Sequence, residues 1–303
     1  MNPKPGAILV ATDFSDAAAL AAQRAAVLAT ELAATLVLVH AISAPAWSDQ
    51  ALGAPRVPVV AGHLRAAIEA ALSEQRDRVA ARTDATVEHV LVDGPLHRSL
   101  PLLVQDTGAE WLVLGAGGES AARGLLLGST ADRVLRVAPI PVLLVRTPCE
   151  GPYRRVALAT DFSAGAERAA LHGLRLAGKA QRLLVHVDER LYESTLAYAG
   201  ASAETIEDYR RTSAIESMQQ LESVAERLAA HDGEVVPVLR EGRAGAALQA
   251  LVDEAGIDLL VIGRHGRSRL EAALLGSTGR FATSALRCDV LVGCDEGSAP
   301  IGG

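Results

Sequence analysis

Short runs of consecutive apolar residues recur along the first half of the chain, and helix-like segments separate them. The runs are rich in Val, Ile and Leu, as parallel strands buried on both faces are. The segment 15–34 between two of them is dominated by Ala and Leu, which favour helix. This alternation predicts an open, doubly wound parallel sheet with right-handed crossovers. The expected strands are residues 7–12, 36–40, 86–92, 111–115 and 141–146.

The second half of the chain repeats this order. The sequence "ATDFS" closes the first strand of each half, and its aspartates, Asp13 and Asp161, lie 148 residues apart. The linker "TPCEGPY" at 147–153, with two prolines and a glycine, separates the halves. We therefore expect two domains and a frayed tail, at residues 1–147, 153–294 and 295–303.

Helix starts and long loops can also be placed. Ser15 and Ser163 follow the first strand of each half and suit the N-cap of the next helix. Residues 43–62 contain three prolines and predict a long loop before the second helix. The stretch around 190–205 is its counterpart in the second half. Long loops of this kind are often lids or interfaces.

Composition narrows the classes of function. Half of the 303 residues are hydrophobic and the net charge is −7, which indicates a globular protein and argues against a nucleic-acid binder. No run of about 18 uncharged apolar residues occurs, so we expect no membrane span. The acidic Asp13 comes too early for a secretory signal. Three cysteines without metal-ligand spacing indicate a reducing compartment, so the expected location is cytoplasmic.

Each half contains the same glycine framework, Gly-x2-Gly-x9-Gly-Ser-Thr, at the end of its fourth strand. The stretches are "GAGGESAARGLLLGST" at 115–130 and "GRHGRSRLEAALLGST" at 263–278. Glycines let the backbone approach an anion, and free N–H groups at the following helix start point towards it. This layout suits a phosphate. The alternative is that the glycines are only turn and cap residues, copied by duplication.

Asp13 and Asp161 are candidate ligand contacts at the end of the first strand. A carboxylate there can accept a hydrogen bond from a nucleoside hydroxyl or amine. Alternatively, it caps the following helix or orients a turn. With strand order 3-2-1-4-5, each aspartate would face the glycines of the fourth strand where the strand order reverses. Open parallel sheets bind their ligands at that point.

Together, "ATDFS", the "LVH" that closes the second strand and the doubled glycine motif resemble the universal stress protein family in its tandem two-domain form. The resemblance covers nearly the whole chain. It implies an α/β fold, Rossmann-like and similar to the adenine nucleotide alpha hydrolases, with two tandem doubly wound five-stranded parallel sheets of order 3-2-1-4-5. It also implies pairing through the fifth strands, at 142–145 and 290–292, as an intramolecular pseudo-dimer or between chains as a homodimer.

The resemblance implies an adenine nucleotide as ligand, ATP, with Mg²⁺ as part of the nucleotide complex. Asp13 and Asp161 would contact its adenosine end, and main-chain atoms of Ala41 and Val187 would meet the adenine. His40 and His186, at strand ends, are expected to be structural and hydrogen-bonded. The residues that would hold ribose and phosphates are Gly115, Gly118, Gly128, Ser129 and Thr130 in the first half, and Gly263, Gly266, Gly276, Ser277 and Thr278 in the second. Leu114, Ile262 and Arg267 are also expected to contact the nucleotide.

The two glycine motifs differ in charge. The first contains Glu119 and only one basic residue, Arg123. The second contains Arg264, His265, Arg267 and Arg269. Because a triphosphate is anionic, we expect the second half to bind ATP more tightly, by about tenfold or more. The alternative is a solvated charged surface without such a role.

These observations support three hypotheses of function. The first is a cytoplasmic ATP-binding regulatory protein of the stress response, whose nucleotide biases a surface for an unidentified protein partner. The second is a slow ATP hydrolase, although no activated nucleophile, metal-ligand cluster or P-loop lysine is found in the sequence. The third is a nucleotide-free interaction module that keeps the fold.

Overall fold

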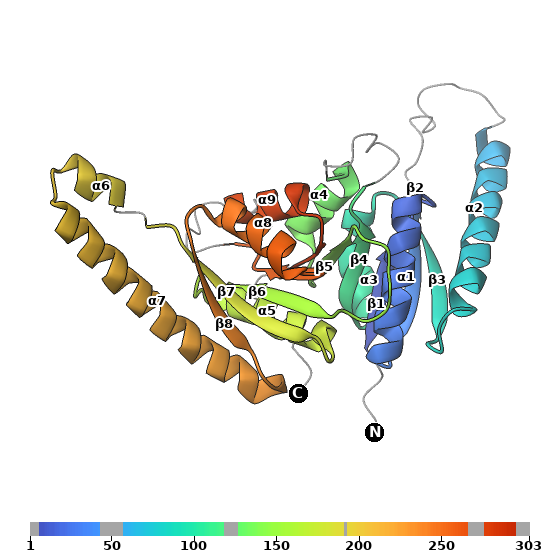
Figure 1. Cartoon of the computed structure of the whole chain (residues 1–303). Helices are drawn as coiled ribbons and strands as arrows, with labels where there is room; N and C mark the ends of the chain where they lie inside the picture. Colours follow the sequence, from blue (N-terminus) through green and yellow to red (C-terminus); the bar gives the residue numbers. More distant parts are fainter. Residues whose placement is uncertain (1–5, 43–56, 118–126, 191–192, 266–275, 295–303) are drawn as a thin grey trace. The chain divides into compact units, whose positions relative to one another are not determined.

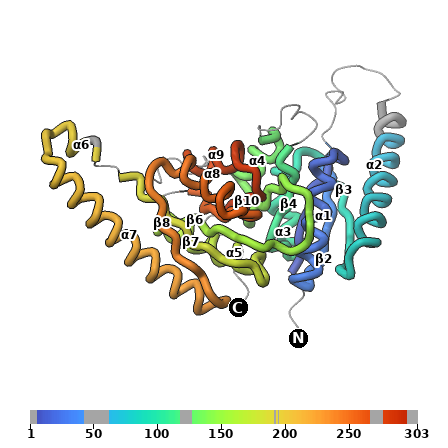
Figure 2. The backbone as a smooth tube through the Cα atoms, in the orientation of Figure 1, coloured from blue at the N-terminus to red at the C-terminus, as the bar shows by residue number. Residues whose placement is uncertain are grey.

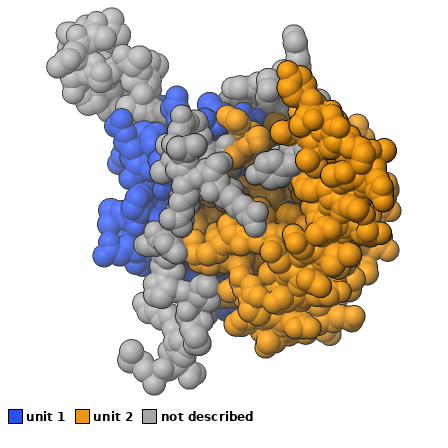
Figure 3. Space-filling view, turned by 90° about the vertical axis from the view of Figure 1, so that its left-hand side faces the viewer, with its two compact units in different colours: residues 1–151, 297–303 blue, residues 152–296 orange. Residues whose placement is uncertain are grey.

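The computed structural model describes residues 6–42, 57–117, 127–190, 193–265 and 276–294. The chain divides into two compact units, residues 1–151 with 297–303 and residues 152–296, which Figure 3 colours separately. Each unit alternates strands and helices along the chain, as Figures 1 and 2 trace. Within the described residues, no helix combines the length and apolarity that a membrane crossing requires.

Unit 1 contains five parallel strands in the order β3-β2-β1-β4-β5. Its helices α1 and α2 contact one another, as do α3 and α4, and right-handed crossovers place these two pairs on opposite faces of the sheet. The elements are β1 (Ala7–Ala11), α1 (Asp16–Glu31), β2 (Thr35–Ile42), α2 (Val57–Ala80), β3 (Val87–Asp93), α3 (Leu96–Thr107), β4 (Ala109–Gly115), α4 (Ser129–Val137) and β5 (Val142–Val145).

Unit 2 repeats this sheet, in the order β8-β7-β6-β9-β10. It has one additional short helix, α6, before its long helix α7. The elements are β6 (Arg155–Ala159), α5 (Ala164–Ala177), β7 (Gln181–Asp188), α6 (Glu193–Tyr198), α7 (Ala203–Asp232), β8 (Val236–Glu241), α8 (Ala244–Ala255), β9 (Leu259–Ile262), α9 (Ser277–Ala285) and β10 (Asp289–Val292).

The continuous apolar runs form the core because both faces of each sheet are covered. Ile8, Leu9 and Val10 of the central strand β1 are fully buried. Close packing of α5 against β9 depends on Gly173, where a Cβ atom would lie 2.6 Å from the side chain of Val261. The predicted fold class is therefore confirmed, with the strand order 3-2-1-4-5 in each unit.

Several local predictions are also settled. Ser15 and Ser163 cap α1 and α5, as expected, by accepting the N–H groups of Ala18 and Ala166. The predicted loop at 43–62 is wrong at its end, because α2 begins at Val57. Pro58 lies in the first turn of α2, where a missing N–H costs no helical hydrogen bond.

The loop expected around 190–205 also contains helical residues. Helix α6 occupies Glu193–Tyr198 within it. Ser202 then accepts the N–H of Thr205 and starts α7 at Ala203. A serine before a helical segment is an N-cap signal, and the prediction of a loop did not take it into account. Cys288 is buried, whereas Cys294 is half-buried.

Candidate functional site

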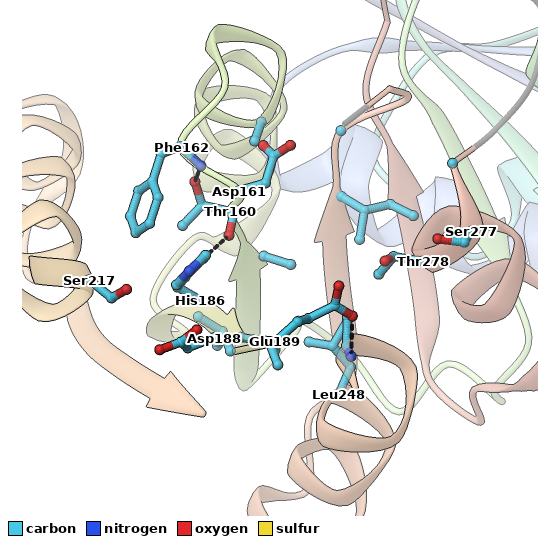
Figure 4. Close-up of a pocket in the computed structure, with 18 of the residues that line it drawn as sticks. Thr160, Asp161, Phe162, His186, Asp188, Glu189, Ser217, Leu248, Ser277 and Thr278 are labelled. Atoms are coloured by element: carbon cyan, nitrogen blue, oxygen red, sulfur yellow. Dashed lines mark hydrogen bonds between the residues drawn. The ribbon is translucent and has the colours of Figure 1, made fainter. Parts of the chain in front are cut away.

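In unit 2, the carboxyl ends of β6, β7 and β9 surround a cavity of about 530 Å³ (Figure 4). Helices α7, α8 and α9 complete its wall. Ligand pockets of roughly 300–1,000 Å³ are typical for small molecules. Unit 1 has the corresponding cavity, of about 290 Å³, at the carboxyl ends of β1, β2 and β4. Both cavities lie where the strand order reverses, as the sequence predicts.

A tight turn after β6 holds Asp161 at the cavity. The Oγ1 atom of Thr160 accepts the N–H of Phe162 at 2.9 Å, and Oδ1 of Asp161 accepts the N–H of Ser163 at 3.0 Å. Phe162 has φ 64°, a left-handed conformation that is uncommon outside glycine. The turn-orienting role considered for this aspartate is therefore present, and the hydrogen bond of this turn employs one of its two carboxylate oxygens, Oδ1.

Unit 1 reproduces this turn with Thr12, Asp13 and Phe14. The N–H of Phe14 donates to Thr12 Oγ1 at 3.0 Å, and the N–H of Ser15 donates to Asp13 Oδ1 at 3.0 Å. Phe14 has φ 65°. Two copies of a strained turn at the same strand end show that the conformation belongs to the fold rather than to one unit.

The histidines of the second strands brace these turns. His186 Nδ1 lies 2.8 Å from the carbonyl oxygen of Thr160, and its ring centroid is 4.2 Å from that of Phe162. His40 makes the same contact with Thr12, at 2.8 Å, and stacks on Phe14 at 4.7 Å. The predicted structural, hydrogen-bonded role of both histidines is confirmed.

The first glycine of each motif is explained by packing. At Gly115, a Cβ atom would lie 2.5 Å from the backbone of Ala17 in α1. At Gly263, it would lie 3.2 Å from the backbone nitrogen of Ala166 in α5. Each glycine therefore lets the strand end approach the N-terminal turn of the helix that follows the aspartate.

The backbone conformation at the last glycine of each motif does not require a glycine. Gly128 is the N-cap of α4 with φ −61°, and Gly276 is the N-cap of α9 with φ −55°. Any residue adopts these angles. The N–H groups of the first turn lack intrahelical partners and carry the positive end of the helix dipole. This arrangement can receive an anionic group.

The structure brings the predicted residues of each half together. Three of them, Gly118, Gly266 and Arg267, lie outside the described residues, as do Glu119, Arg123 and Arg269. All the others line the two cavities: Asp13, Ala41, Leu114, Gly115, Gly128, Ser129 and Thr130 in unit 1, and Asp161, Val187, Ile262, Gly263, Gly276, Ser277 and Thr278 in unit 2. Ala41 and Val187 lie within strands that extend further than predicted.

Sequence reasoning missed several residues that line the cavities. In unit 1, His97 of α3 and Arg133 of α4 add basic side chains from outside the glycine motif. In unit 2, where Arg264 and His265 line the cavity, five polar residues of α7 also do so: Tyr209, Ser213, Glu216, Ser217 and Gln220. None of these belongs to a motif. They are polar residues on helices, which ordinarily face solvent, and only the packing of those helices brings them to the cavities.

Ion pairs hold the start of α7 in place. The guanidinium of Arg210 forms two hydrogen bonds with Glu193 of α6, which lower the pKa of that carboxyl below its usual value. Arg190, which follows β7, pairs with Glu241 of β8 and lies 3.8 Å from Glu193. The loop after β7 is thereby tied to both α6 and β8.

Comparisons with known proteins agree with this geometry. The sequence model described as the universal stress protein family matches twice, over residues 6–146 and 152–292. A universal stress protein of Mycobacterium tuberculosis is 29% identical over 205 residues. That match covers 64% of this chain and 65% of the mycobacterial protein. Universal stress protein A homolog 2 of Coxiella burnetii is 29% identical over 119 residues, 39% of this chain and 77% of that protein.

A solved structure shares the fold over nearly all of the chain. The crystal structure of a universal stress protein from Archaeoglobus fulgidus covers 97% of this chain and 100% of its own, with a TM-score of 0.73 and 18% sequence identity.

Proposed function

The chain belongs to the universal stress protein family, and from that premise we propose that it is an ATP-binding regulatory protein of the stress response, with unit 2 the stronger nucleotide site. One observation carries the proposal. In each unit, a strand-end aspartate, a pair of glycines and a helix N-terminus converge on one cavity at the point where the strand order reverses. That point is where open parallel sheets bind ligands.

The residues present suit an adenine nucleotide. Asp161 would accept a hydrogen bond from the adenosine end, and main-chain atoms of Val187 would meet the base. Ser277 and Thr278 of the first turn of α9 would donate to the phosphates together with the free backbone N–H groups. Mg²⁺ would enter as part of the nucleotide complex. Asp13, Ala41 and the start of α4 would act in the same way in unit 1.

Two differences support stronger binding in unit 2. Its cavity is about 530 Å³, against about 290 Å³ in unit 1. Arg264 and His265 line it, where the matching residues of unit 1 are Ala116 and Gly117. His97 and Arg133 offset part of this difference in unit 1. We therefore expect a preference of about tenfold rather than an exclusive site.

The test is the nucleotide content of the purified full-length chain. The protein is denatured, and the released small molecules are identified by chromatography and mass spectrometry. We expect an adenine nucleotide at about one or two molecules per chain, or equivalent binding of added ATP to nucleotide-free protein. Protein that carries no nucleotide and binds no ATP would support the interaction-module hypothesis instead. Steady ATP turnover much above about 1 s⁻¹ would support the hydrolase.

A further inference from the structure

The side of helix α7 that faces the sheet is apolar in its C-terminal half and polar towards its N-terminus, where the helix lines the cavity. Leu221, Val224 and Leu228 in its C-terminal half are buried, and the helix contacts β7 and β8. Towards its N-terminus, the same side of the helix becomes polar and lines the cavity. These residues, spaced to share one helix face, are Ser213, Glu216, Ser217 and Gln220.

The corresponding helix of unit 1 has no such face. Three buried positions align the two helices, because Leu72, Gln75 and Val79 of α2 each precede their α7 counterparts, Leu221, Val224 and Leu228, by 149 residues. At the same offset, the four polar residues of α7 correspond to apolar residues of α2: Leu64, Ala67, Ile68 and Ala71. Within the described part of α2, no residue lines the unit 1 cavity.

The difference extends to the neighbouring strand. In unit 2, the hydroxyl of Ser213 donates to Asp188 Oδ2 at 2.8 Å, which joins α7 to the end of β7. Asp188 lies opposite Glu241 in the sheet, and its unit 1 equivalent, Ile42, lies opposite Asp93. A hydrogen-bonded pair, Asp188 and Ser213, thus takes the place of the apolar residues Ile42 and Leu64. The two units therefore differ at two neighbouring elements at once, the end of the second strand and the helix that follows it.

The group formed by Asp188, Ser213, Glu216, Ser217 and Gln220, here termed the α7 compartment, is rich in hydrogen-bond acceptors. Asp188 accepts the backbone N–H of Arg190 at 3.0 Å as well as the Ser213 hydroxyl. Glu216 is exposed and forms no ion pair with another described residue. An ionised carboxylate accepts hydrogen bonds and cannot donate them. The compartment therefore complements a ligand group that donates hydrogen bonds.

The two sides of the unit 2 cavity therefore offer different hydrogen-bonding groups, donors on one side and acceptors on the other. In Figure 4, Ser217 lies on one side of the cavity, with Asp188 near it, and Ser277 and Thr278 lie on the other. The α9 side offers N–H and hydroxyl donors at a helix N-terminus, which suit an anion. The α7 side offers acceptors. The ligand that fits has an anionic group at one end and a donor group at the other.

We propose that the α7 compartment recognises the amino group of a nucleotide base, so that unit 2 selects nucleotides with an amino-bearing base whereas unit 1 does not. This inference rests on the proposed nucleotide function. It assigns base selectivity to side chains of α7 and β7 that unit 1 lacks, and it explains why the larger cavity is also the one with a polar helix face.

The experiment compares two triphosphates that differ only in the amino group, ATP and purine riboside triphosphate. Binding is measured by titration calorimetry on the full-length chain with Gly128→Val, which blocks unit 1. We expect ATP to bind about tenfold more tightly, because a hydrogen bond from the amino group to a carboxylate is lost in the analogue. In the Gly276→Val chain, which reports unit 1, the two affinities should agree within about twofold.

A graft then tests the residues themselves. The variant that combines Asp188→Ile, Ser213→Leu, Glu216→Ala, Ser217→Ile and Gln220→Ala gives the compartment the residues found at the matching positions of unit 1. It should bring the affinity ratio in unit 2 to about one and leave the affinity for purine riboside triphosphate within about twofold. Ile215→Ser, on an exposed residue of α7 outside the cavity lining, is the matched control and should keep the tenfold ratio.

The outcomes separate the two proposals. If neither triphosphate binds the parent protein, the nucleotide function itself is wrong. If both bind but the graft retains the tenfold ratio, the function stands and the α7 compartment does not read the base. Equal loss of both ligands in a graft whose circular dichroism is unchanged also contradicts the inference. The single variant Glu216→Gln, which alters no volume, should lower the ratio on its own.

Discussion

Gly115 lies so close to Ala17 that a Cβ atom on the glycine would come within 2.5 Å of the backbone of α1. Gly115→Ala should therefore destabilise unit 1, by about 1–3 kcal/mol, because the helix must move away from the strand end. Denaturant unfolding of nucleotide-free protein measures this loss. Gly263→Ala is the matched control: its nearest contact would be 3.2 Å, so its loss should be smaller. Equal losses would contradict this explanation of the glycine.

Valine at the helix-capping glycines should separate the two proposed nucleotide sites. Gly276→Val and Gly128→Val place a branched side chain at the start of α9 and α4, where backbone angles of φ −55° and −61° accept it. We expect Gly276→Val to remove the tighter ATP-binding event and Gly128→Val the weaker one. Titration calorimetry resolves the two events. The predicted asymmetry fails if both variants cost the same affinity.

Removing the brace behind one aspartate should affect one unit only. In His186→Ala, the contact with the Thr160 carbonyl oxygen and the tilted ring contact with Phe162 are both lost. We expect about 1–2 kcal/mol lower stability and weaker ATP binding in unit 2, because the turn that holds Asp161 loosens. His40→Ala is the control for unit 1. It should leave binding at unit 2 unchanged, and a loss there would show that the brace acts otherwise.

Acid should weaken the link between α5 and α7. Arg227 donates two hydrogen bonds to Glu167, at 3.0 and 2.9 Å, and these lower the pKa of that carboxyl below 4.5. A carboxyl with a lowered folded pKa stabilises the protein above its unfolded pKa. That contribution is lost as the pH falls from about 4.5 through the folded value.

The measurement compares wild type with Glu167→Gln by thermal unfolding across this pH range. The variant should be slightly less stable at pH 7, since exposed ion pairs contribute little. The two proteins should converge as the pH falls from about 4.5 through the lowered pKa of Glu167 in the folded protein. A difference that persists at low pH would show that Glu167 acts through packing rather than through its charge.

The predicted strands overlap the observed ones, although several differ at their ends, because both faces of each sheet are covered. A buried parallel strand needs an unbroken apolar run, and "AILVA" at 7–11 is recognisable without any tertiary information. The helix-capping roles of Ser15 and Ser163 could also be predicted from the neighbouring sequence alone. The start of helix α2 was harder to predict. Pro58 indicates a loop in the sequence, although proline is also well accommodated in the first turn of a helix, where the structure places it.

The site was predictable only where it carries a motif. Asp161, Gly263 and Gly276 were found because their spacing repeats in the other half. Glu216 and Ser217 were not, since a polar residue on a long helix is ordinarily a solvated one, and only the path of α7 past the end of β7 brings them to the cavity. His97 and Arg133 escaped for the same reason, being contributed by helices outside the motif.

The doubling of the fold within one chain has an evolutionary consequence. When two identical subunits associate, every substitution appears in both sites at once, so neither can change alone. Here unit 2 carries Asp188 and Ser213 where unit 1 carries Ile42 and Leu64, a difference that two separately encoded copies permit. Covalent linkage also fixes the two kinds of site at a ratio of one to one. With the two nucleotide sites proposed above, such a protein would respond to two different concentrations, or two different chemical forms, of a single metabolite.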